Sequence, residues 1–442
     1  MNKLFKNTRF EKLHWKYFNK FTLPNYSMKN NKGGFMSLNK LNKALTQNVH
    51  DLEASGRAKG EEKVITKVIP PKDGKGPRYI LEGFGNKEFI RMNSNSYLGL
   101  SLRQDMIDAE EAGAKEFGVG PGAVRFINGT FKAHTDLEEK LANFHGREAG
   151  MIFSSAYVTS IGVIYPLTTK ETVLISDELN HNCIINAIRL GKPVAKEIYS
   201  HNNMEELEQA LERSVGKGKR ALVITDGIFS MRGDHAPLDK LVEICKKYDD
   251  KFEEGVISII DDSHGVGAFG PTGKGTEEYV NTKVDILVGT LGKAFGVNGG
   301  YVVSSKDVIK YLRESAPTYI YSNPITVSES EAAMKALDIL DSGEGQEVLK
   351  HLKEMTKRFE NGLKEAGYET IEGDHPVVPL MVRDSKKTSN MVKHLNENGI
   401  LATGLNYPVV PKGDEEIRFQ INASHTKEDI DFVLDILKKY QD

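Results

Sequence analysis

Short apolar runs alternate with helical stretches between about residues 130 and 303, and this alternation constrains the fold more than any other feature. The runs are rich in β-branched residues, and helical patterns, such as those at 183–190 and 238–248, separate several of them. Such strands are typical of a parallel sheet that helices cover on both faces. The predicted strands are residues 151–155, 172–177, 221–226, 256–260, 286–288 and 301–303.

The order of elements changes after about residue 325. A long helical stretch at 328–352 is followed by strand-like residues 377–382 and 417–421, with helices predicted at 387–397 and 427–440. This pattern predicts a smaller α+β domain after the large one. We therefore predict four parts: a basic extension (1–35), an N-terminal segment (36–95), a large domain (96–325) and a small C-terminal domain (326–442).

Composition excludes several classes of protein. The chain has 442 residues, of which 39% are hydrophobic and 27% charged, the balance of a soluble globular protein. No apolar run reaches the ~18 residues that a membrane helix needs. A net charge of -3 argues against a nucleic-acid binder. With only Cys183 and Cys245, neither a disulfide framework nor a four-cysteine zinc site can form, and no metal is expected.

The first 50 residues carry ten Lys or Arg and one acidic residue. Three interpretations of residues 1–35 stay open: a disordered extension or upstream start before Met36, a targeting peptide, or a docking arm. The expected location is cytoplasmic, or mitochondrial if this segment is a targeting peptide.

Two constellations suggest chemistry on pyridoxal 5′-phosphate (PLP). Asp261 ends one predicted strand and His264 follows it, while Lys293 lies on a Gly-rich turn just past another strand. Functional residues of open parallel sheets gather at the carboxyl ends of strands, so these side chains are expected to meet. PLP needs an amine for its aldehyde, a carboxylate for its pyridine nitrogen and small donors for its phosphate.

Each residue type has a common structural explanation as well. An aspartate at a strand end is often only a helix cap, and a lone lysine is usually on the surface. Asp261 and the adjacent Asp262 point to opposite faces of a strand, so only one can face the ring. The small residues around Lys293 favour tight packing and a Schiff-base role, and Thr290 can donate to the phosphate.

Two glycine-rich segments do not match nucleotide-binding motifs. Residues 118–122 lack the Gly-Lys-Ser/Thr of a phosphate loop, and no G-x-G-x-x-G follows a first strand. We interpret residues 118–122 as a glycine-lined turn beside the cofactor.

Over residues 45–440 the chain resembles the α-oxoamine synthases, PLP enzymes that join an amino acid to an acyl-CoA. The resemblance is carried by residues 95–100 (Asn-Ser-Tyr-Leu-Gly-Leu), 125–130 (Arg-Phe-Ile-Asn-Gly-Thr), 180–181 (Asn-His), 226–231 (Asp-Gly-Ile-Phe-Ser-Met), 261–264 (Asp-Asp-Ser-His) and 290–293 (Thr-Leu-Gly-Lys). It implies the fold-type I, aspartate aminotransferase-like architecture and a homodimer with shared active sites.

The resemblance also implies roles for individual residues. Lys293, His181, Asp261 and His264 would be catalytic, with His181 stacking on the ring and Lys293 acting later as general base. The implied cofactor-binding set is Ser155, Ala156, Tyr157, His181, Ser230, Asp261, His264, Thr290, Lys293 and Ser322. Ser322 or Thr290 would reach the phosphate from the neighbouring subunit. Asn95, His134 and Arg418 would bind substrate.

Substrate choice depends on other segments. Residues 407–413 and 417–426 resemble glycine C-acetyltransferases, which implies condensation of glycine with acetyl-CoA to 2-amino-3-oxobutanoate, or the reverse cleavage. Asn128 resembles serine palmitoyltransferase-like members, so the alternative is another small amino acid with a longer acyl-CoA, as in 8-amino-7-oxononanoate synthase. A plain aminotransferase and a non-catalytic homologue are the remaining hypotheses.

Overall fold

The computed structural model describes residues 36–55, 57–407 and 409–440, which fall into two compact units, 1–61 and 62–442. In the first unit the described element is helix α2 (Met36–Ala54), which exposes an apolar row at helical spacing. The row consists of Leu38, Leu41, Leu45, Val49 and Leu52. The predicted basic extension at 1–35, and residue 408 within the segment 407–413, lie outside the described residues.

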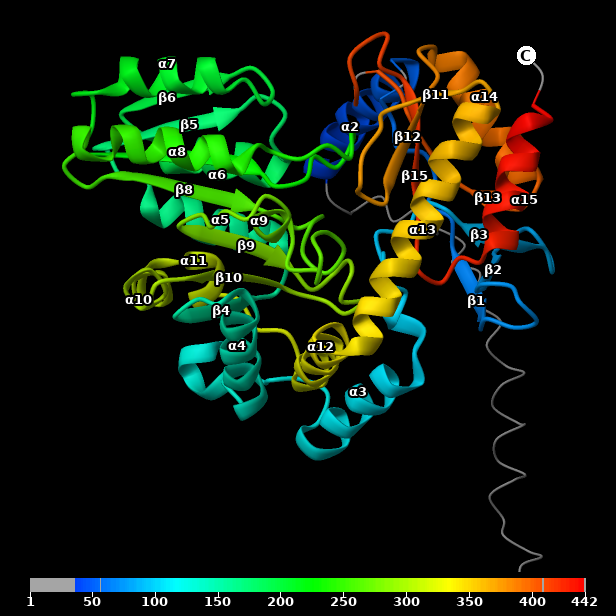
Figure 1. The fold of residues 1–442 in the computed structure, drawn as a ribbon, viewed down its shortest axis with the longest axis horizontal. Helices are drawn as coiled ribbons and strands as arrows, with labels where there is room; N and C mark the ends of the chain where they lie inside the picture. The colour runs from blue at the N-terminus through cyan, green and yellow to red at the C-terminus, as the bar shows by residue number, and fades with distance from the viewer. Residues whose placement is uncertain (1–35, 56, 408, 441–442) are drawn as a thin grey trace, which may run out of the picture. The chain divides into compact units, whose positions relative to one another are not determined.

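A seven-stranded sheet forms the centre of the second unit (Figure 1). Four adjacent pairs are parallel, which confirms the predicted α/β fold with a mainly parallel sheet. In spatial order the strands are β4 (Ala149–Phe153), β10 (Gly300–Ser304), β9 (Ile286–Thr290), β8 (Val256–Asp261), β7 (Arg220–Asp226), β5 (Thr172–Asp177) and β6 (Ala195–Tyr199).

Strand β10 runs antiparallel to both of its neighbours and is the exception in the mainly parallel sheet. Only residues 291–299 connect β9 to β10. A parallel return needs a crossover of a dozen or more residues, whereas a short loop can join only antiparallel neighbours. The short connection therefore reverses the strand, and it is this loop that carries Lys293.

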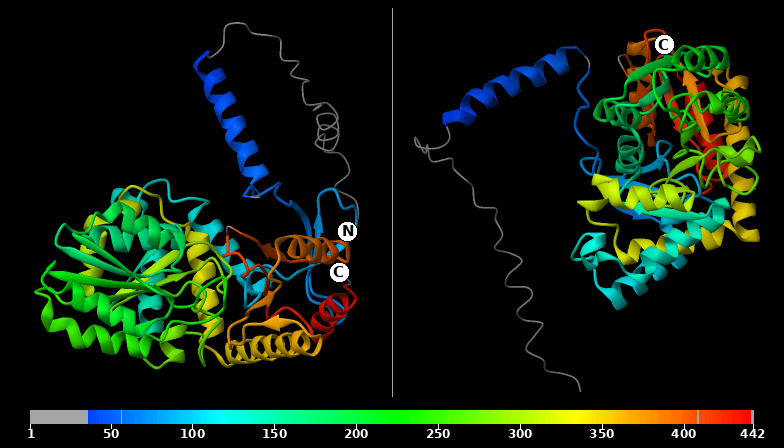
Figure 2. Two further views of the ribbon diagram at one scale, coloured as in Figure 1. Left: turned by 90° about the horizontal axis from the view of Figure 1, so that it is seen from above. Right: turned by 90° about the vertical axis from the view of Figure 1, so that its left-hand side faces the viewer.

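Both faces of the sheet are buried, which explains why its strands are almost continuously apolar. Val173 and Val223 belong to one hydrophobic cluster, and their neighbours Leu174 and Leu222 belong to another on the opposite face. Figure 2 shows helices on both sides of the sheet. The first face is covered by α4 (Lys132–His145), α7 (Met204–Ser214) and α8 (Leu238–Tyr248), the second by α5 (Ala156–Leu167), α6 (Asn182–Gly191) and α10 (Lys306–Ser315).

The C-terminal part forms a second, antiparallel sheet. Its strands are, in order, β11 (Glu369–Thr370), β12 (Val377–Met381), β15 (Glu416–Gln420) and β14 (Thr403–Leu405). Its helices are α13 (Gly343–Glu365), α14 (Ser385–Glu397) and α15 (Lys427–Lys438). The single long helix predicted at 328–352 is instead two helices, α12 (Val327–Leu340) and α13, because Asp341 ends the first and Ser342 caps the second.

The N-terminal strands extend the C-terminal part. Strands β1 (Ile65–Ile69), β2 (Arg78–Leu81) and β3 (Glu88–Arg91) form a sheet that β13 (Ile400–Leu401) completes by pairing parallel to β3. Arg78 forms an ion pair with the buried Asp429 of α15. Chain segments more than 300 residues apart thus share one structural layer.

Candidate active site

One pocket of about 200 Å³ lies at the carboxyl ends of β7 and β8, beside the loop that follows β9. Strands that end at one edge of a parallel sheet bring their terminal side chains together. The lining residues are Ala156, Tyr157, His181, Cys183, Asp226, Ile228, Ser230, Asp261, Ser263, His264 and Lys293. Most of the cofactor-binding residues expected from the sequence therefore share this pocket.

Lys293 is held by a tightly folded loop. The Leu291 N–H donates to the Gly299 carbonyl (3.0 Å), and the Gly296 N–H donates to the carbonyl of Lys293 itself (3.0 Å). Gly296 has a φ of +74°, and a Cβ there would lie 2.8 Å from the Ser101 nitrogen. Only glycine fits this position, so the small residues around Lys293 serve close packing.

The environment of Lys293 favours a neutral amine. The side chain keeps some exposure through the pocket, but surrounding protein lowers its pKa to about 8, against the opposing effect of Asp261 and Asp226. With this pKa about a tenth of the amine is neutral at pH 7, far more than for an ordinary lysine, and the neutral amine is the form that attacks an aldehyde.

Asp261 is fixed by donors from three residues at the end of β8. Its Oδ2 accepts from Ser160 Oγ (2.6 Å) and Cys183 Sγ (3.6 Å), and its Oδ1 accepts from both the backbone N–H (3.1 Å) and Oγ (2.5 Å) of Ser263. Asp262 instead accepts from the N–H and Oγ1 of Thr276, both at 2.7 Å, and burial raises its pKa to about 7. Of the two adjacent aspartates, Asp261 is the one that lines the pocket.

Asp226 is a second pocket carboxylate, and it was absent from the residues predicted as functional. It pairs in register with Asp261, and its Oδ2 accepts the backbone N–H of His181 (2.9 Å). Burial, together with the charge of Asp261, raises the pKa of Asp226 well above its ordinary value. Asp226 ends an apolar strand just as Asp261 does, so the same strand-end rule could have found it.

His264 is paired with Tyr97 in the protein interior. The distance from Tyr97 Oη to His264 Nδ1 is 2.7 Å. Burial raises the pKa of Tyr97 and lowers that of His264, so both groups are neutral near pH 7. His375 donates from Nε2 to the His264 carbonyl (2.9 Å), which fixes the turn. Tyr97 lies within the segment 95–100, but no local pattern indicates its partner.

The N-terminus of α5 opens beside the pocket. Ser155 is the N-cap, with its Oγ accepting the Val158 N–H (3.5 Å), and Ala156 and Tyr157 form the first turn. The unpaired N–H groups of a first helical turn are suited to an anion such as a phosphate. Tyr157 donates from its hydroxyl to Asn182 Oδ1 (3.0 Å), and its ring lies edge-on to that of His181.

Arg418 approaches from the small sheet. Its Nη1 donates to the Ser230 carbonyl (3.0 Å), and its buried Nε has no hydrogen-bond partner within the described residues. Gln420 lies two residues further on the same face of β15, where its amide contacts Asn95 Oδ1. The structure thus places Arg418 in contact with the pocket residue Ser230 and Asn95 in contact with Gln420, and neither Arg418 nor Asn95 belongs to the pocket lining.

Three predicted residues have other contacts in the chain. His134 is fully buried: its Nδ1 accepts the Phe131 N–H (3.1 Å), and its Nε2 contacts the Ile325 carbonyl (2.9 Å). Thr290 donates to the Gly299 carbonyl (3.2 Å), and Ser322 Oγ contacts the Asn323 carbonyl (3.4 Å). The pocket lining includes none of the three.

The described residues contain neither a metal-binding cluster nor a membrane-spanning helix. Within residues 36–55, 57–407 and 409–440, no group of three or more His, Cys, Asp or Glu side chains could hold a metal ion. No helix in this part of the chain combines the length and apolar character needed to cross a membrane.

Known proteins match most of the chain. The sequence profile of the family Aminotransferase class I and II matches residues 87–437. The 8-amino-7-oxononanoate synthase of Thermosipho melanesiensis is 40% identical over 355 residues, which cover 80% of this chain and 88% of that enzyme. The same enzyme from Petrotoga mobilis is 41% identical, with the same coverage.

Solved structures match the fold. Serine palmitoyltransferase from S. paucimobilis, with a bound PLP–myriocin aldimine, superposes with a TM-score of 0.79 at 27% identity, covering 89% of this chain and 96% of that one. The 8-amino-7-oxononanoate synthase of Francisella tularensis has a TM-score of 0.67 at 24% identity, covering 79% and 97%.

The fold and the family match define a PLP-dependent enzyme of the class I and II aminotransferase type. Within that class the chain belongs to the α-oxoamine synthase family, whose members are PLP-dependent C-acyltransferases. The fold-type I architecture and the PLP cofactor expected from the sequence are confirmed.

The pocket fits this cofactor. It offers the Lys293 amine for the aldehyde, the Asp261 carboxylate for the pyridine nitrogen, and the first turn of α5 for the phosphate. The low pKa of Lys293 and the donors that fix Asp261 are properties of this chain that suit those contacts.

Proposed function

We propose that the enzyme condenses a small amino acid, alanine or serine, with an acyl-CoA longer than acetyl-CoA. The observation that carries the proposal is that Lys293 and the Asp226–Asp261 pair line one pocket, with Arg418 bonded to the carbonyl of Ser230, another residue of the lining. Relatives named 8-amino-7-oxononanoate synthase, about 40% identical over most of the chain, favour this substrate class over acetyl transfer to glycine.

The residue roles follow from the contacts. When bound, PLP supplies an electron sink for a carbanion at the amino-acid Cα. Arg418, with an Nε that has no partner among the described residues, is the candidate for the substrate carboxylate. Lys293 Nζ, with a pKa of about 8, can accept the Cα proton near neutral pH. Asp261 would hold the ring nitrogen of the bound cofactor, and Ser230 and His264 would contribute polar atoms beside it.

Glycine with acetyl-CoA is the second candidate, on the resemblance of segments 407–413 and 417–426 to glycine C-acetyltransferases. In the structure the second segment supplies Arg418, and it also supplies Asn422, whose side chain donates to the Ser96 carbonyl (2.5 Å). The segment therefore links the carboxylate-binding strand to the N-terminal motif 95–100, and this link supports a role in substrate choice.

A panel of amino acids and acyl-CoAs, scored by CoA release, separates the candidates. The proposal expects the highest kcat/KM for alanine or serine with an acyl chain of about seven carbons or more. A seven-carbon acyl group with a terminal carboxylate, joined to alanine with loss of carbon dioxide, gives the 8-amino-7-oxononanoate skeleton. Preference for glycine and acetyl-CoA would replace the proposal with the second candidate.

Two further outcomes of the panel would reject both candidates. Amino-group transfer to a 2-oxo acid without CoA release would identify an aminotransferase. Purified protein that stays colourless after PLP is added would identify a non-catalytic homologue.

We also infer a homodimer with shared active sites. Helix α2 exposes its row of five apolar residues, and Val119, Phe126 and Tyr321 are 86%, 65% and 79% exposed. Large exposed apolar side chains of this kind mark protein interfaces. A partner could bring Ser322 or Thr290 to the phosphate, as the resemblance implies. Size-exclusion chromatography with light scattering tests the dimer.

Two further expectations remain proposals. The large and small domains would divide at about residue 325, with 36–95 as an N-terminal segment. The cytoplasmic location finds support in the bacterial relatives.

A further inference from the structure

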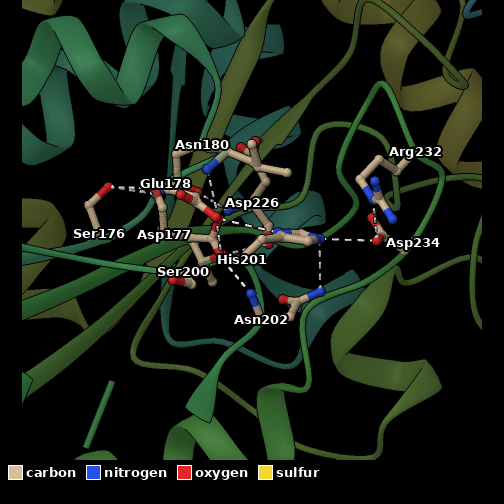
Figure 3. A network of polar contacts seen from close by, with 12 residues as sticks. Ser176, Asp177, Glu178, Asn180, Ser200, His201, Asn202, Asp226, Arg232 and Asp234 are labelled. Atoms are coloured by element: carbon tan, nitrogen blue, oxygen red, sulfur yellow. Dashed lines mark hydrogen bonds and ion pairs between the residues drawn. The ribbon is translucent and has the colours of Figure 1, made fainter. Parts of the chain in front are cut away.

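The imidazole of His201 lies between two carboxylates that come from different parts of the chain (Figure 3). His201 follows the edge strand β6, Asp177 ends the neighbouring strand β5, and Asp234 lies in the segment after β7. The distance from Nδ1 to Asp177 Oδ1 is 3.3 Å, and that from Nε2 to Asp234 Oδ2 is 3.0 Å. His201 thus joins the sheet edge to the segment after β7.

Both ring nitrogens must donate, because each faces a carboxylate oxygen. The Asn202 amide nitrogen, which is 3.3 Å from Nε2, donates to the His235 carbonyl (3.2 Å), and the Asp234 oxygen at 3.0 Å is the nearer group and an acceptor for Nε2–H. Burial by itself would lower the pKa of His201, but the hydrogen bonds to Asp177 and Asp234 raise it to about 9. The ring is therefore a cation near pH 7.

The charged groups around His201 are predominantly acidic. Glu178 accepts the His201 backbone N–H at Oε1 (2.9 Å), and Glu206 accepts that of Ser200 (2.8 Å). Arg232 is the opposing cation, and its Nε donates to the same Asp234 oxygen (3.0 Å). The charged set is Asp177, Glu178, Glu206, Arg232 and Asp234.

Residues 227–236 form a hairpin that His201 contacts directly. Its base is closed by the Ala236 N–H to the Gly227 carbonyl (2.9 Å) and by the Phe229 N–H to the Asp234 carbonyl (3.0 Å). The His201 ring packs edge-on against Phe229, with centroids 4.3 Å apart. His201 therefore holds the hairpin by one charged hydrogen bond and one ring contact.

The tip of the hairpin reaches the active site. Ser230 lines the pocket, and its carbonyl accepts from Arg418 Nη1 (3.0 Å). A shift of the hairpin would move Ser230 and remove this anchor of the guanidinium. A misplaced positioning group weakens substrate binding even when it lies away from the reacting atoms.

We propose that His201 is a positioning residue, which clamps the hairpin 227–236 between the two carboxylates and thereby sets the place of Ser230 and of the Arg418 guanidinium. The role of Arg418 in carboxylate binding rests on the proposed function, whereas the clamp itself does not.

The clamp has a defined pH dependence. Because the pKa of His201 is about 9 in the clamp and about 6.5 for a free histidine, its stabilising effect is complete below pH 6.5 and is lost as the pH rises through 9. The hairpin should therefore be protected near pH 7 and should loosen near pH 9.

Hydrogen–deuterium exchange of the PLP-loaded enzyme tests the clamp. At pH 7, His201→Gln should exchange the amides of residues 229–236 at least about tenfold faster than wild type, while strand β7 is unchanged. His394→Gln is the matched control, since His394 is also half-buried and contacts a carbonyl, that of Ile436, in the small domain. In His394→Gln the amides of residues 229–236 should exchange at the wild-type rate.

Two further measurements keep the test independent of how His201→Gln folds. In wild type, hairpin protection, corrected for the chemical exchange rate, should fall as the pH passes from 6.5 to 9. His201→Arg keeps a cation that does not titrate in this range, so its hairpin should stay protected at pH 9. Equal exchange of His201→Gln and wild type at pH 7, or wild-type protection that does not change with pH, would overturn the proposal.

Kinetics test the link to Arg418. With the amino acid that turns over best, His201→Gln should raise KM for the amino acid about fivefold or more and change kcat less than about twofold. If the hairpin of His201→Gln exchanges faster but KM for the amino acid is unchanged, the link to Arg418 is rejected, while the clamp on the hairpin is still supported. If no combination of amino acid and acyl-CoA turns over, the proposed function is rejected. Hydrogen exchange then still tests whether His201 holds the hairpin.

Discussion

The most unusual residues of the pocket are the two aspartates at neighbouring strand ends. Asp226 and Asp261 pair in register, and two close carboxylates cannot both ionise cheaply. Burial and the charge of Asp261 raise the pKa of Asp226 well above its ordinary value, while Asp261 accepts hydrogen bonds from Ser160, Cys183 and Ser263. Asp226 orients His181 through the backbone N–H of that residue, and Asp261 is held in the pocket by side chains on both of its oxygens.

Asparagine substitutions should distinguish the two aspartates. Asn has the shape of the carboxyl group and can still accept the His181 N–H, so Asp226→Asn should retain kcat within about threefold. Asp261→Asn removes the carboxylate and should lower kcat by about 100-fold or more, about 2.7 kcal/mol of activation free energy. Steady-state kinetics with each variant measure this, and equal losses would contradict the assignment.

Replacement of Lys293 gives a test of the cofactor contact. Lys293→Ala removes the only amine of the pocket lining, so the purified variant should lack the borohydride-reducible visible absorbance of wild type with PLP. Absorbance spectra before and after borohydride check this, with Lys306→Ala, an exposed lysine of α10, as control. Retention of the reducible absorbance in Lys293→Ala would show that another amine binds the cofactor.

At the scale of elements, apolar runs revealed the buried strands and the edge strand β4 but not the other edge strand, β6. The sequence of β6, Ala-Lys-Glu-Ile-Tyr, alternates between half-buried and exposed residues, so no apolar run indicates it. Edge strands have one neighbour only and keep polar residues. The strand that places His201 was therefore missed, although every strand of the sheet interior was predicted.

The break between α12 and α13 depends on one side chain. Ser342 Oγ accepts the Gly345 N–H (3.4 Å) at the start of α13, a helix that the glycines 343 and 345 weaken. Ser342→Ala should lower the free energy of unfolding by about 1 kcal/mol. Thermal unfolding with saturating PLP measures this change in the free energy of unfolding. Ser389 is exposed, so the control Ser389→Ala should change the free energy of unfolding by no more than about 0.5 kcal/mol.

At the scale of the whole second unit, residues 76–78 are fixed to the C-terminal part by buried charge. Asp429 is 1% exposed at its side chain, and it accepts from Arg78 and from the Gly76 N–H (2.9 Å). It is also the N3 residue of the capping box that begins α15. The Asp429 carboxylate thus connects residues 76–78 with the beginning of helix α15.

Breaking this buried ion pair should lower the free energy of unfolding more than breaking an exposed ion pair does. Arg78→Met leaves Asp429 buried without its cation, and we expect a loss of about 3 kcal/mol in the free energy of unfolding. Arg358→Met removes the exposed partner of Asp431 and should cost about 1 kcal/mol or less. Urea unfolding of both variants measures the difference, and equal midpoints would contradict the structural role of Asp429.

The sequence by itself determined the fold class, the cofactor and most of the pocket residues, because strand runs, small-residue turns and strand-end carboxylates are local patterns. Tertiary structure alone decided the rest. Tyr97 and His264 are separated by 167 residues, and Asp177, His201 and Asp234 come from three different connections. Which polar groups pair, and which carboxyl group has a raised pKa, depends on burial and distance, and these arise only when the sheet brings its strand ends together.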